Sequence, residues 1–220
     1  RKSQVLLKNQ EALPLRRGQR LLVAGSHADD LGLQSGGWTL VWSGFQGDNS
    51  RLPGATTLLA GLRQVGGDVT PIEYSPTGDF SGPQADAAIV LVGEPPYSEW
   101  LGDRDADGLR LTAEDQALIA RLRPQARKLI LVLVTGRPLI LDRAWAASDA
   151  IVVAWLPGSE GAGVADILFG ESPFSGRLPY AWPGDSSGLG PAPVMPTGTG
   201  PAGLGPGPGL LFPEGYRLGD

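Results

Sequence analysis

The sequence has no cysteine, a single histidine (His27) and a single methionine (Met195) among 220 residues. Without cysteine there is no disulfide framework, zinc finger or thiol nucleophile, and one histidine excludes a metal centre built from several histidines. Lysine and arginine number 18 against 23 acidic residues, a net charge of −5. A chain this acidic lacks the basic footprint of nucleic-acid binding. No window approaches the roughly 18 apolar residues that a membrane-spanning helix needs.

No methionine precedes Met195, and residue 1 is arginine. Because translation normally begins with methionine, we expect the chain to be processed, excised or split from something longer. The lack of a signal peptide at this end therefore says nothing about the compartment.

Short apolar runs alternate with helical patterns along the first three quarters of the chain. The runs at 20–25, 85–93, 128–135 and 150–154 have the composition of buried strands. Helices are expected over 56–65, 112–123 and 161–169. This alternation predicts an α/β fold, a layered sandwich with a mostly parallel β-sheet flanked by helices. Ligands of such sheets bind beyond the carboxyl ends of the strands, so the loops that follow the runs are the first candidates for function.

The composition also predicts how the chain is divided. Residues 1–182 should form the sandwich domain. In 183–209, 16 of the 27 residues are glycine or proline and charge almost vanishes, which indicates an extended connector. Residues 210–220 begin with the apolar run Leu210-Leu211-Phe212 and should form a C-terminal anchor segment.

The first candidate site is the loop at 25–42, which reads GSHADDLGLQSGGWTLVW. Its glycines do not match the dinucleotide-binding pattern. Trp38 and Trp42 either pack inward or present flat apolar faces on which a sugar can stack. Ser26, His27 and Asp29 lie too close together in one loop to converge as a catalytic triad.

The second candidate is the segment 92–103, VGEPPYSEWLGD, where two carboxylates follow a predicted buried strand. Glu94 and Glu99 bracket a rigid Pro-Pro-Tyr turn, and Trp100 is adjacent. A carboxylate among apolar neighbours is a candidate general acid, because such neighbours raise its pKa. The alternative is that one glutamate caps a turn and the other is solvated. A third, glycine-rich segment at 155–166 precedes a helix, and it favours close packing of helix against strand over phosphate binding.

Several segments together resemble one family. GSHADDLGLQSGGWT, VGEPPYSEWLGD, TGRPLIL, AWLPGSEGAGVADILFGESPFSGRLP and LFPEGYRLG are similar, in this order, to the second domain of glycoside hydrolase family 3, in its β-glucosidase and exo-β-glucanase branch. The resemblance implies a retaining glycosidase that lacks any cofactor. An aspartate on a preceding (β/α)₈-type barrel would be the nucleophile, and a glutamate of the second domain would be the acid and then the base. No segment resembles the barrel motif, so we expect the barrel to be absent from this chain.

The resemblance also suggests roles for individual residues. Glu99 stands at the matching distance before Gly102-Asp103-Arg104 and is the expected acid/base, with Glu94 second. Trp42 would lie beside the aglycone subsite, with Trp38 shaping the loop. The implied partners are a β-glucoside or β-glucan oligosaccharide and the barrel, and a periplasmic or secreted location is favoured. Gly215-Tyr216-Arg217 departs from the family's Gly-Tyr-Gly, which questions how the tail docks.

Two alternatives remain open. The chain could be a non-catalytic carbohydrate-binding or interaction module that uses Trp38, Trp42 and Trp100 as a sugar platform. A flavodoxin-like cofactor binder would suit the fold but does not match the motifs.

Overall fold

The computed structural model describes residues 1–102, 104, 108–184 and 210–218. Its main feature is a six-stranded sheet in the order β1-β6-β5-β4-β2-β3. The strands are β1 (Val5–Asn9), β2 (Leu21–Ala24), β3 (Ile72–Tyr74), β4 (Ala85–Gly93), β5 (Ala126–Val134) and β6 (Ala150–Val153). All neighbouring pairs are parallel except β1, which pairs antiparallel with β6. The prediction of a mostly parallel sheet is confirmed.

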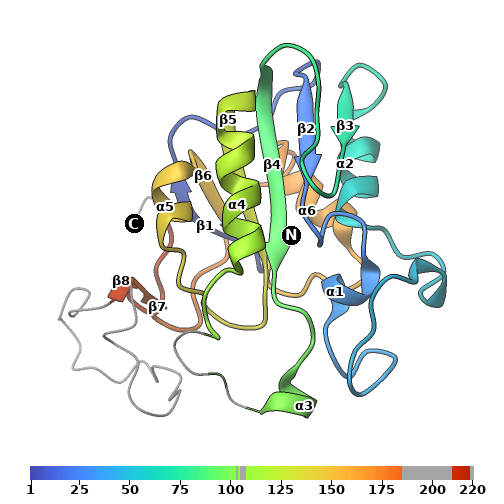
Figure 1. Cartoon of the computed structure of the whole chain (residues 1–220), viewed down its shortest axis with the longest axis vertical. Coiled ribbons are helices and arrows are strands. Elements are labelled where there is room, and N and C mark those ends of the chain that lie inside the picture. Colours follow the sequence, from blue (N-terminus) through green and yellow to red (C-terminus); the bar gives the residue numbers. More distant parts are fainter. Residues whose placement is uncertain (103, 105–107, 185–209, 219–220) are drawn as a thin grey trace.

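Helices cover both faces of this sheet (Figure 1). Helices α2 (Leu58–Gly66) and α6 (Gly161–Leu168) lie on one face, and α4 (Ala113–Leu122) and α5 (Arg143–Ala147) on the other. Successive strand residues point to opposite faces. In β4, Val90 and Val92 therefore pack with α4, whereas Ile89 and Leu91 pack with α2 and α6. Every strand buried on two faces needs an unbroken apolar run, and this is why the sequence has such runs.

The predicted strands and helices all occur, with ends displaced by at most two residues, and β4 has the predicted bounds. The additional elements include β1, β3, α1 (Leu31–Ser35), α3 (Ser98–Leu101), α5, and the 3₁₀ turns η1 (Asn49–Arg51) and η2 (Arg123–Gln125), all of them short. Elements of three to five residues are too short to display a hydrophobic period, so their sequences did not reveal them.

The glycine-rich segment that leads into α6 brings this helix close to α2, while Val164, Ala165 and Leu168 of α6 pack on the sheet as predicted. A Cβ atom on Gly161 would lie 2.3 Å from the carbonyl oxygen of Thr57, and one on Gly61 would lie 2.6 Å from the backbone of Gly161. Both glycines therefore allow α2 and α6 to approach closely.

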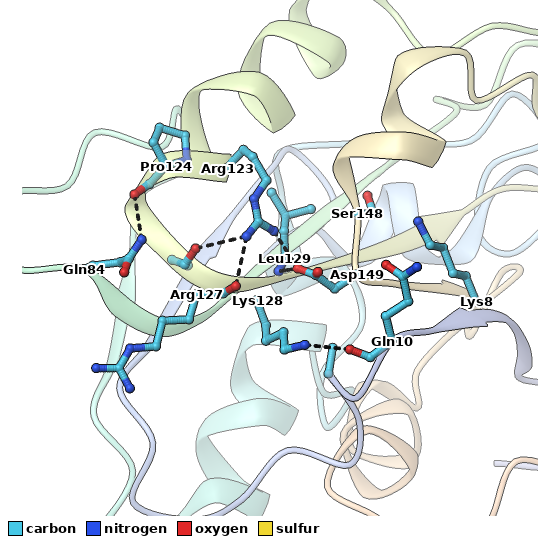
Figure 2. Close-up of polar contacts among 12 residues, drawn as sticks. Lys8, Gln10, Gln84, Arg123, Pro124, Arg127, Lys128, Leu129, Ser148 and Asp149 are labelled. Carbon is cyan, nitrogen blue, oxygen red and sulfur yellow. Dashed lines mark hydrogen bonds and ion pairs between the residues drawn. The ribbon is translucent and has the colours of Figure 1, made fainter.

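Polar contacts fasten the amino edge of the sheet (Figure 2). The Arg123 guanidinium pairs with the Asp149 carboxylate at 2.5 Å. The same carboxylate oxygen accepts the backbone N–H of Leu129 at 2.7 Å. Nearby, the Lys128 ammonium donates to the carbonyl oxygen of Gln10 at 2.7 Å. These contacts connect η2, the start of β6 and the chain after β1 to strand β5.

The C-terminal part of the described chain returns to the sandwich. Strand β7 (Trp182–Pro183) pairs antiparallel with β8 (Leu210–Phe212). The Phe212 ring lies 5.5 Å from Trp145 of α5 and stacks on Tyr216 at 4.0 Å between ring centroids. Strand β7 therefore crosses the expected boundary at 182/183. Residues 185–209 of the expected connector lie outside the described residues.

Candidate functional site

The loops that follow β2, β4 and β5 gather at the carboxyl edge of the sheet. Helices α1 and α3 lie there, at the end to which β4 points (Figure 1). Residues 36–37, 94–98, 136–137 and 156 line a cleft of about 180 Å³ between these loops. The cleft lies where a parallel sheet is expected to place its ligand.

Glu94 is the first residue after β4, and its carboxylate is directed into the protein. Oε2 accepts a hydrogen bond from the Thr135 hydroxyl at 2.6 Å, while Oε1 is buried without a hydrogen-bond partner among the described residues. Burial raises the pKa of Glu94, and the Thr135 hydrogen bond and the charge of Arg137 oppose that rise. This carboxylate ties the loop after β4 to the loop after β5, and Glu94 also lines the cleft.

Tyr97 lies beside Glu94 and carries two arginines on its ring. The guanidinium carbon of Arg104 is 3.9 Å from the ring centroid and that of Arg137 is 5.2 Å away. Burial, followed by the charge of Glu94, raises the pKa of Tyr97 to about 12. The tyrosine is therefore neutral at physiological pH, and the two arginines provide positive charge near the buried carboxylate.

Glu99 is more exposed than Glu94. It is exposed, in the first turn of the short helix α3. Its Oε1 accepts a hydrogen bond from the indole Nε1 of Trp38 at 2.5 Å. Glu99 is therefore available to a ligand at the rim of the cleft and is oriented by a second loop.

The three tryptophans singled out from the sequence lie on the surface of the described chain and not in its core. Trp38 is 74% exposed, Trp42 46% and Trp100 66%. The rings of Trp42 and Trp100 lie 4.9 Å apart at an interplanar angle of 44°. Two loops distant in sequence thus bring a continuous aromatic surface to one side of Glu99, and flat apolar faces of this kind suit the C–H faces of a sugar.

The histidine has a structural position. Nδ1 of His27 lies 2.9 Å from the Ser26 hydroxyl, and Nε2 lies 3.3 Å from the carbonyl oxygen of Glu94. Burial lowers the pKa of His27 to about 4. Both ring nitrogens are occupied by groups other than Asp29, so no triad forms, as the loop spacing predicted.

Sequence reasoning missed the residues that support Glu94. Thr135 and Arg137 follow β5, and Tyr97 lies between the two glutamates. The only signal in the sequence was their position just after buried strands.

Within the described part of the chain, no group of three acidic or histidine side chains could hold a metal ion. None of the described helices is long and apolar enough to cross a membrane.

Comparison with known proteins places this architecture in a class, that of the α/β domains of glycoside hydrolases. Residues 4–219 match the model of the glycosyl hydrolase family 3 C-terminal domain. The chain therefore belongs to this family, and the resemblance inferred from the motifs is confirmed.

Individual relatives agree with this assignment. The lysosomal beta glucosidase of Dictyostelium discoideum is 33% identical over 207 residues, which are 84% of this chain and 25% of that protein. The periplasmic beta-glucosidase of Salmonella typhimurium is 29% identical over 220 residues, covering 83% of this chain and 27% of that protein. The chain thus spans about a quarter of the curated relatives that it matches.

A solved structure gives the same result. The exo-1,3/1,4-beta-glucanase from a Pseudoalteromonas species is 36% identical, with a TM-score of 0.84 over 98% of this chain and 27% of that one. A beta-glucosidase from Listeria innocua, 22% identical with a TM-score of 0.70 over 97% of this chain and 31% of its own, shares the fold.

Proposed function

We propose that this chain is the second domain of a retaining, exo-acting β-glycosidase and that Glu99 is its general acid/base. The nucleophilic aspartate would belong to a (β/α)₈-type barrel, and the substrate would be a β-glucoside or β-glucan oligosaccharide. The observation that carries the proposal is the position of Glu99, an exposed carboxylate that lies beside the cleft and the aromatic surface. The names of the relatives, beta-glucosidases and an exo-beta-glucanase, support the substrate class.

The choice of Glu99 over Glu94 rests on access. A general acid must lie within hydrogen-bond distance of the oxygen that it protonates. Oε1 of Glu94 is buried, and Oε2 already accepts the Thr135 hydroxyl. The raised pKa of Glu94 would suit an acid, but its Oε1 is buried and its Oε2 is engaged with Thr135, which argues against proton delivery from either oxygen. We therefore choose between the two glutamates by the accessibility of their carboxylate oxygens and not by the pKa.

The chemistry needs both domains. In the first step Glu99 gives its proton to the glycosidic oxygen while the aspartate attacks the anomeric carbon. In the second step the Glu99 carboxylate takes a proton from the water that hydrolyses the glycosyl-enzyme. Retaining enzymes hold the two carboxyl groups about 5–5.5 Å apart. Glu99 can meet this requirement because it lies on the outer surface of the described chain, where another domain can approach it.

The aromatic pair would bind the leaving-group side of the substrate. Trp42 and Trp100 form a surface next to Glu99 on which a sugar can stack, and the indole N–H of Trp38 donates to the Glu99 carboxylate. Since the rings come from two loops, the surface keeps its shape only while both loops are in place.

The test is the variant Glu99→Gln in the full-length protein that carries this chain. We expect turnover of glucosides with poor leaving groups to fall about 10²- to 10⁴-fold, because these need general acid assistance. Aryl glucosides with good leaving groups should be affected much less in the first step. With Glu99→Ala, azide should restore turnover of the activated substrate, because this anion attacks the glycosyl-enzyme without a general base.

Glu94→Gln is the matched control, since it makes the same change five residues away. We expect it to disturb stability and activity without selectivity between leaving groups and without rescue by azide. If Glu99→Gln leaves the hydrolysis of both substrate types unchanged, the assignment is wrong. If Glu94→Gln shows the leaving-group dependence instead, the roles are reversed.

The exposed tryptophans also favour a second candidate, a carbohydrate-binding module without catalysis. The 220-residue chain can be titrated with cello- and laminari-oligosaccharides while tryptophan fluorescence is followed, and it can be assayed on an aryl β-glucoside. Binding that Trp42→Ala and Trp100→Ala abolish, together with a full-length protein that hydrolyses no glucoside, would favour the module. The relative named periplasmic supports a periplasmic or secreted location, which cell fractionation would test.

A further inference from the structure

Two loops of the carboxyl edge meet at three successive points. The first loop covers residues 36–44 and the second covers 94–101. Gly44 lies so close to Pro96 that a Cβ atom would be 2.4 Å from the proline ring. The Trp42 ring contacts Trp100. At the third point the indole Nε1 of Trp38 donates to Glu99. We call this pair of loops the loop clamp.

Trp38 has an unusual backbone conformation. Its φ angle is +61°, in the left-handed region that bulky side chains rarely adopt. The backbone N–H of Trp38 is shared between the carbonyl oxygens of Val41 at 3.2 Å and Trp42 at 3.3 Å, which fixes the turn. Burial of the ring does not offset this strain, because the side chain is 74% exposed. In this conformation the indole N–H of Trp38 donates a hydrogen bond to Oε1 of Glu99.

We propose that Trp38 is a positioning residue for Glu99, whose indole N–H holds Oε1 and thereby leaves Oε2 to carry and deliver the proton. This inference rests on the proposed function. It goes beyond that function because it assigns the two oxygens of the carboxyl group different tasks. The orientation of the acid/base carboxyl group would then be fixed by residues of this chain alone, without a contact from another domain.

The chemistry of the indole supports this assignment. The indole N–H is a donor only, so it can bond to an oxygen lone pair and can never accept the proton of a carboxylic acid. The carbonyl oxygen of a carboxylic acid is a better acceptor than its hydroxyl oxygen, so the proposal places the Trp38 contact on the carbonyl oxygen and the proton on Oε2. On transfer, the Oε2–H bond breaks and the proton passes to the glycosidic oxygen. The carboxylate then regains a proton at Oε2 from the attacking water.

The strength of the hydrogen bond from Trp38 also depends on whether Glu99 is ionised. A hydrogen bond to an ionised acceptor is stronger than one to a neutral acceptor. Trp38 therefore stabilises the carboxylate that forms when the proton has left, while fixing the plane of the group. Its loss should lower the rate of proton transfer and leave substrate binding in place.

The decisive variant is Trp38→Phe in the full-length protein, because it keeps an aromatic ring and removes only the donor. We expect kcat for glucosides with poor leaving groups to fall about tenfold, the lower end of what a hydrogen bond to a charged group contributes. KM should change by less than about twofold. The alkaline limb of the pH profile of kcat/KM should move to higher pH, because the carboxylate has lost its donor. Trp145→Phe, the same change far from the cleft, should leave the pH profile unchanged.

A second measurement needs no activity. In nitrogen-15 spectra of the 220-residue chain, the indole signal that disappears in Trp38→Phe should shift as the pH passes through the titration of Glu99. In Glu99→Gln this shift should be lost. A Trp38 signal that responds identically in the wild type and in Glu99→Gln would overturn the inference.

The two proposals can fail separately. If Glu99→Gln shows the leaving-group dependence while Trp38→Phe changes neither kcat nor the pH profile, Glu99 is the acid/base and Trp38 has no role in positioning it. If Glu99→Gln leaves activity unchanged although the indole signal follows Glu99, the contact is real and the proposed function is wrong.

Discussion

The two edges of the sheet use polar side chains in opposite ways. At the amino edge, Asp149 pairs with Arg123 and also accepts a backbone N–H, and Lys128 ends on a backbone carbonyl. At the carboxyl edge, Oε1 of Glu94 is buried without a partner among the described residues, and Glu99 lies exposed beside a strained tryptophan that donates to it. Polar groups at the first edge are paired with one another or with the backbone, whereas Glu99 at the second edge is exposed. Stability and activity should therefore be separable by mutation.

The largest expected effect is on activity. Glu99→Gln should lower kcat for poor leaving groups by at least about a hundredfold. Its thermal unfolding midpoint should stay within about 2 °C of the wild type, because an exposed residue contributes little to stability. Calorimetry and kinetics on the same preparation check this, and a large drop in the midpoint would show that Glu99 also stabilises the fold.

The next effect concerns pH and the buried histidine. The unfolded chain binds a proton at His27 below its ordinary pKa of 6.5, whereas the folded chain keeps the ring neutral until about pH 4. The unfolded state therefore holds more protons in this window. His27 should lower the free energy of unfolding progressively as the pH falls from 6.5, by about 3 kcal/mol at pH 4.

Urea unfolding of the wild type and of His27→Gln between about pH 4 and 7 measures this dependence as a difference. The subtraction matters because Glu94 acts in the opposite direction: burial raises its pKa, so its protonation favours the folded state. Parallel curves for the two proteins would show that His27 is not the cause.

At the amino edge we expect an effect on stability alone. Asp149→Ala should lower the free energy of unfolding by about 2 kcal/mol, because it leaves the Arg123 guanidinium and the N–H of Leu129 without their acceptor. Activity per folded molecule of the full-length protein should be unchanged. A selective loss of activity with poor leaving groups would contradict the division between the edges.

The smallest effect is expected for a matched ion pair on the surface. Arg121 and Asp79 are 3.1 Å apart, with side chains 50% and 72% exposed. Asp79→Ala should change the free energy of unfolding by less than about 0.5 kcal/mol, because solvent screens such pairs. Urea unfolding of Asp79→Ala and of Asp149→Ala compares the loss of an exposed carboxylate with the loss of a more buried one. The difference between the two free energies of unfolding separates the effect of burial from that of charge.

The layers of the fold could be predicted because buried parallel strands must be apolar throughout. The run at 85–93 became β4 with the same bounds, and its neighbours differ by at most two residues. Strand β3 and helix α3 escaped prediction, since three or four residues carry no period. The antiparallel partner of β6 could not be identified either, because nothing local in 5–9 specifies a strand so distant in sequence.

The candidate site was predictable as a set of residues but not as an arrangement. The position of Glu94 and Glu99 after a strand indicated carboxylates at the sheet edge. Glu94 is hydrogen-bonded to Thr135, and Glu99 is hydrogen-bonded to Trp38, which is 61 positions away in the sequence. Both contacts are tertiary contacts between loops. The left-handed conformation of Trp38 is likewise a property of the loop clamp, because local propensity opposes it.

The pairing of β1 with β6 has a consequence for synthesis of the chain. Val5 lies opposite Val153, so the first strand leaves the ribosome 148 residues before its partner does. At translation rates of about 5–20 residues per second, it waits roughly 7–30 s with its hydrogen-bonding groups unpaired. The closing step of the sheet is therefore a long-range one that slows folding. The six-stranded sheet therefore cannot be complete until β6, its last strand in the chain, has been synthesised.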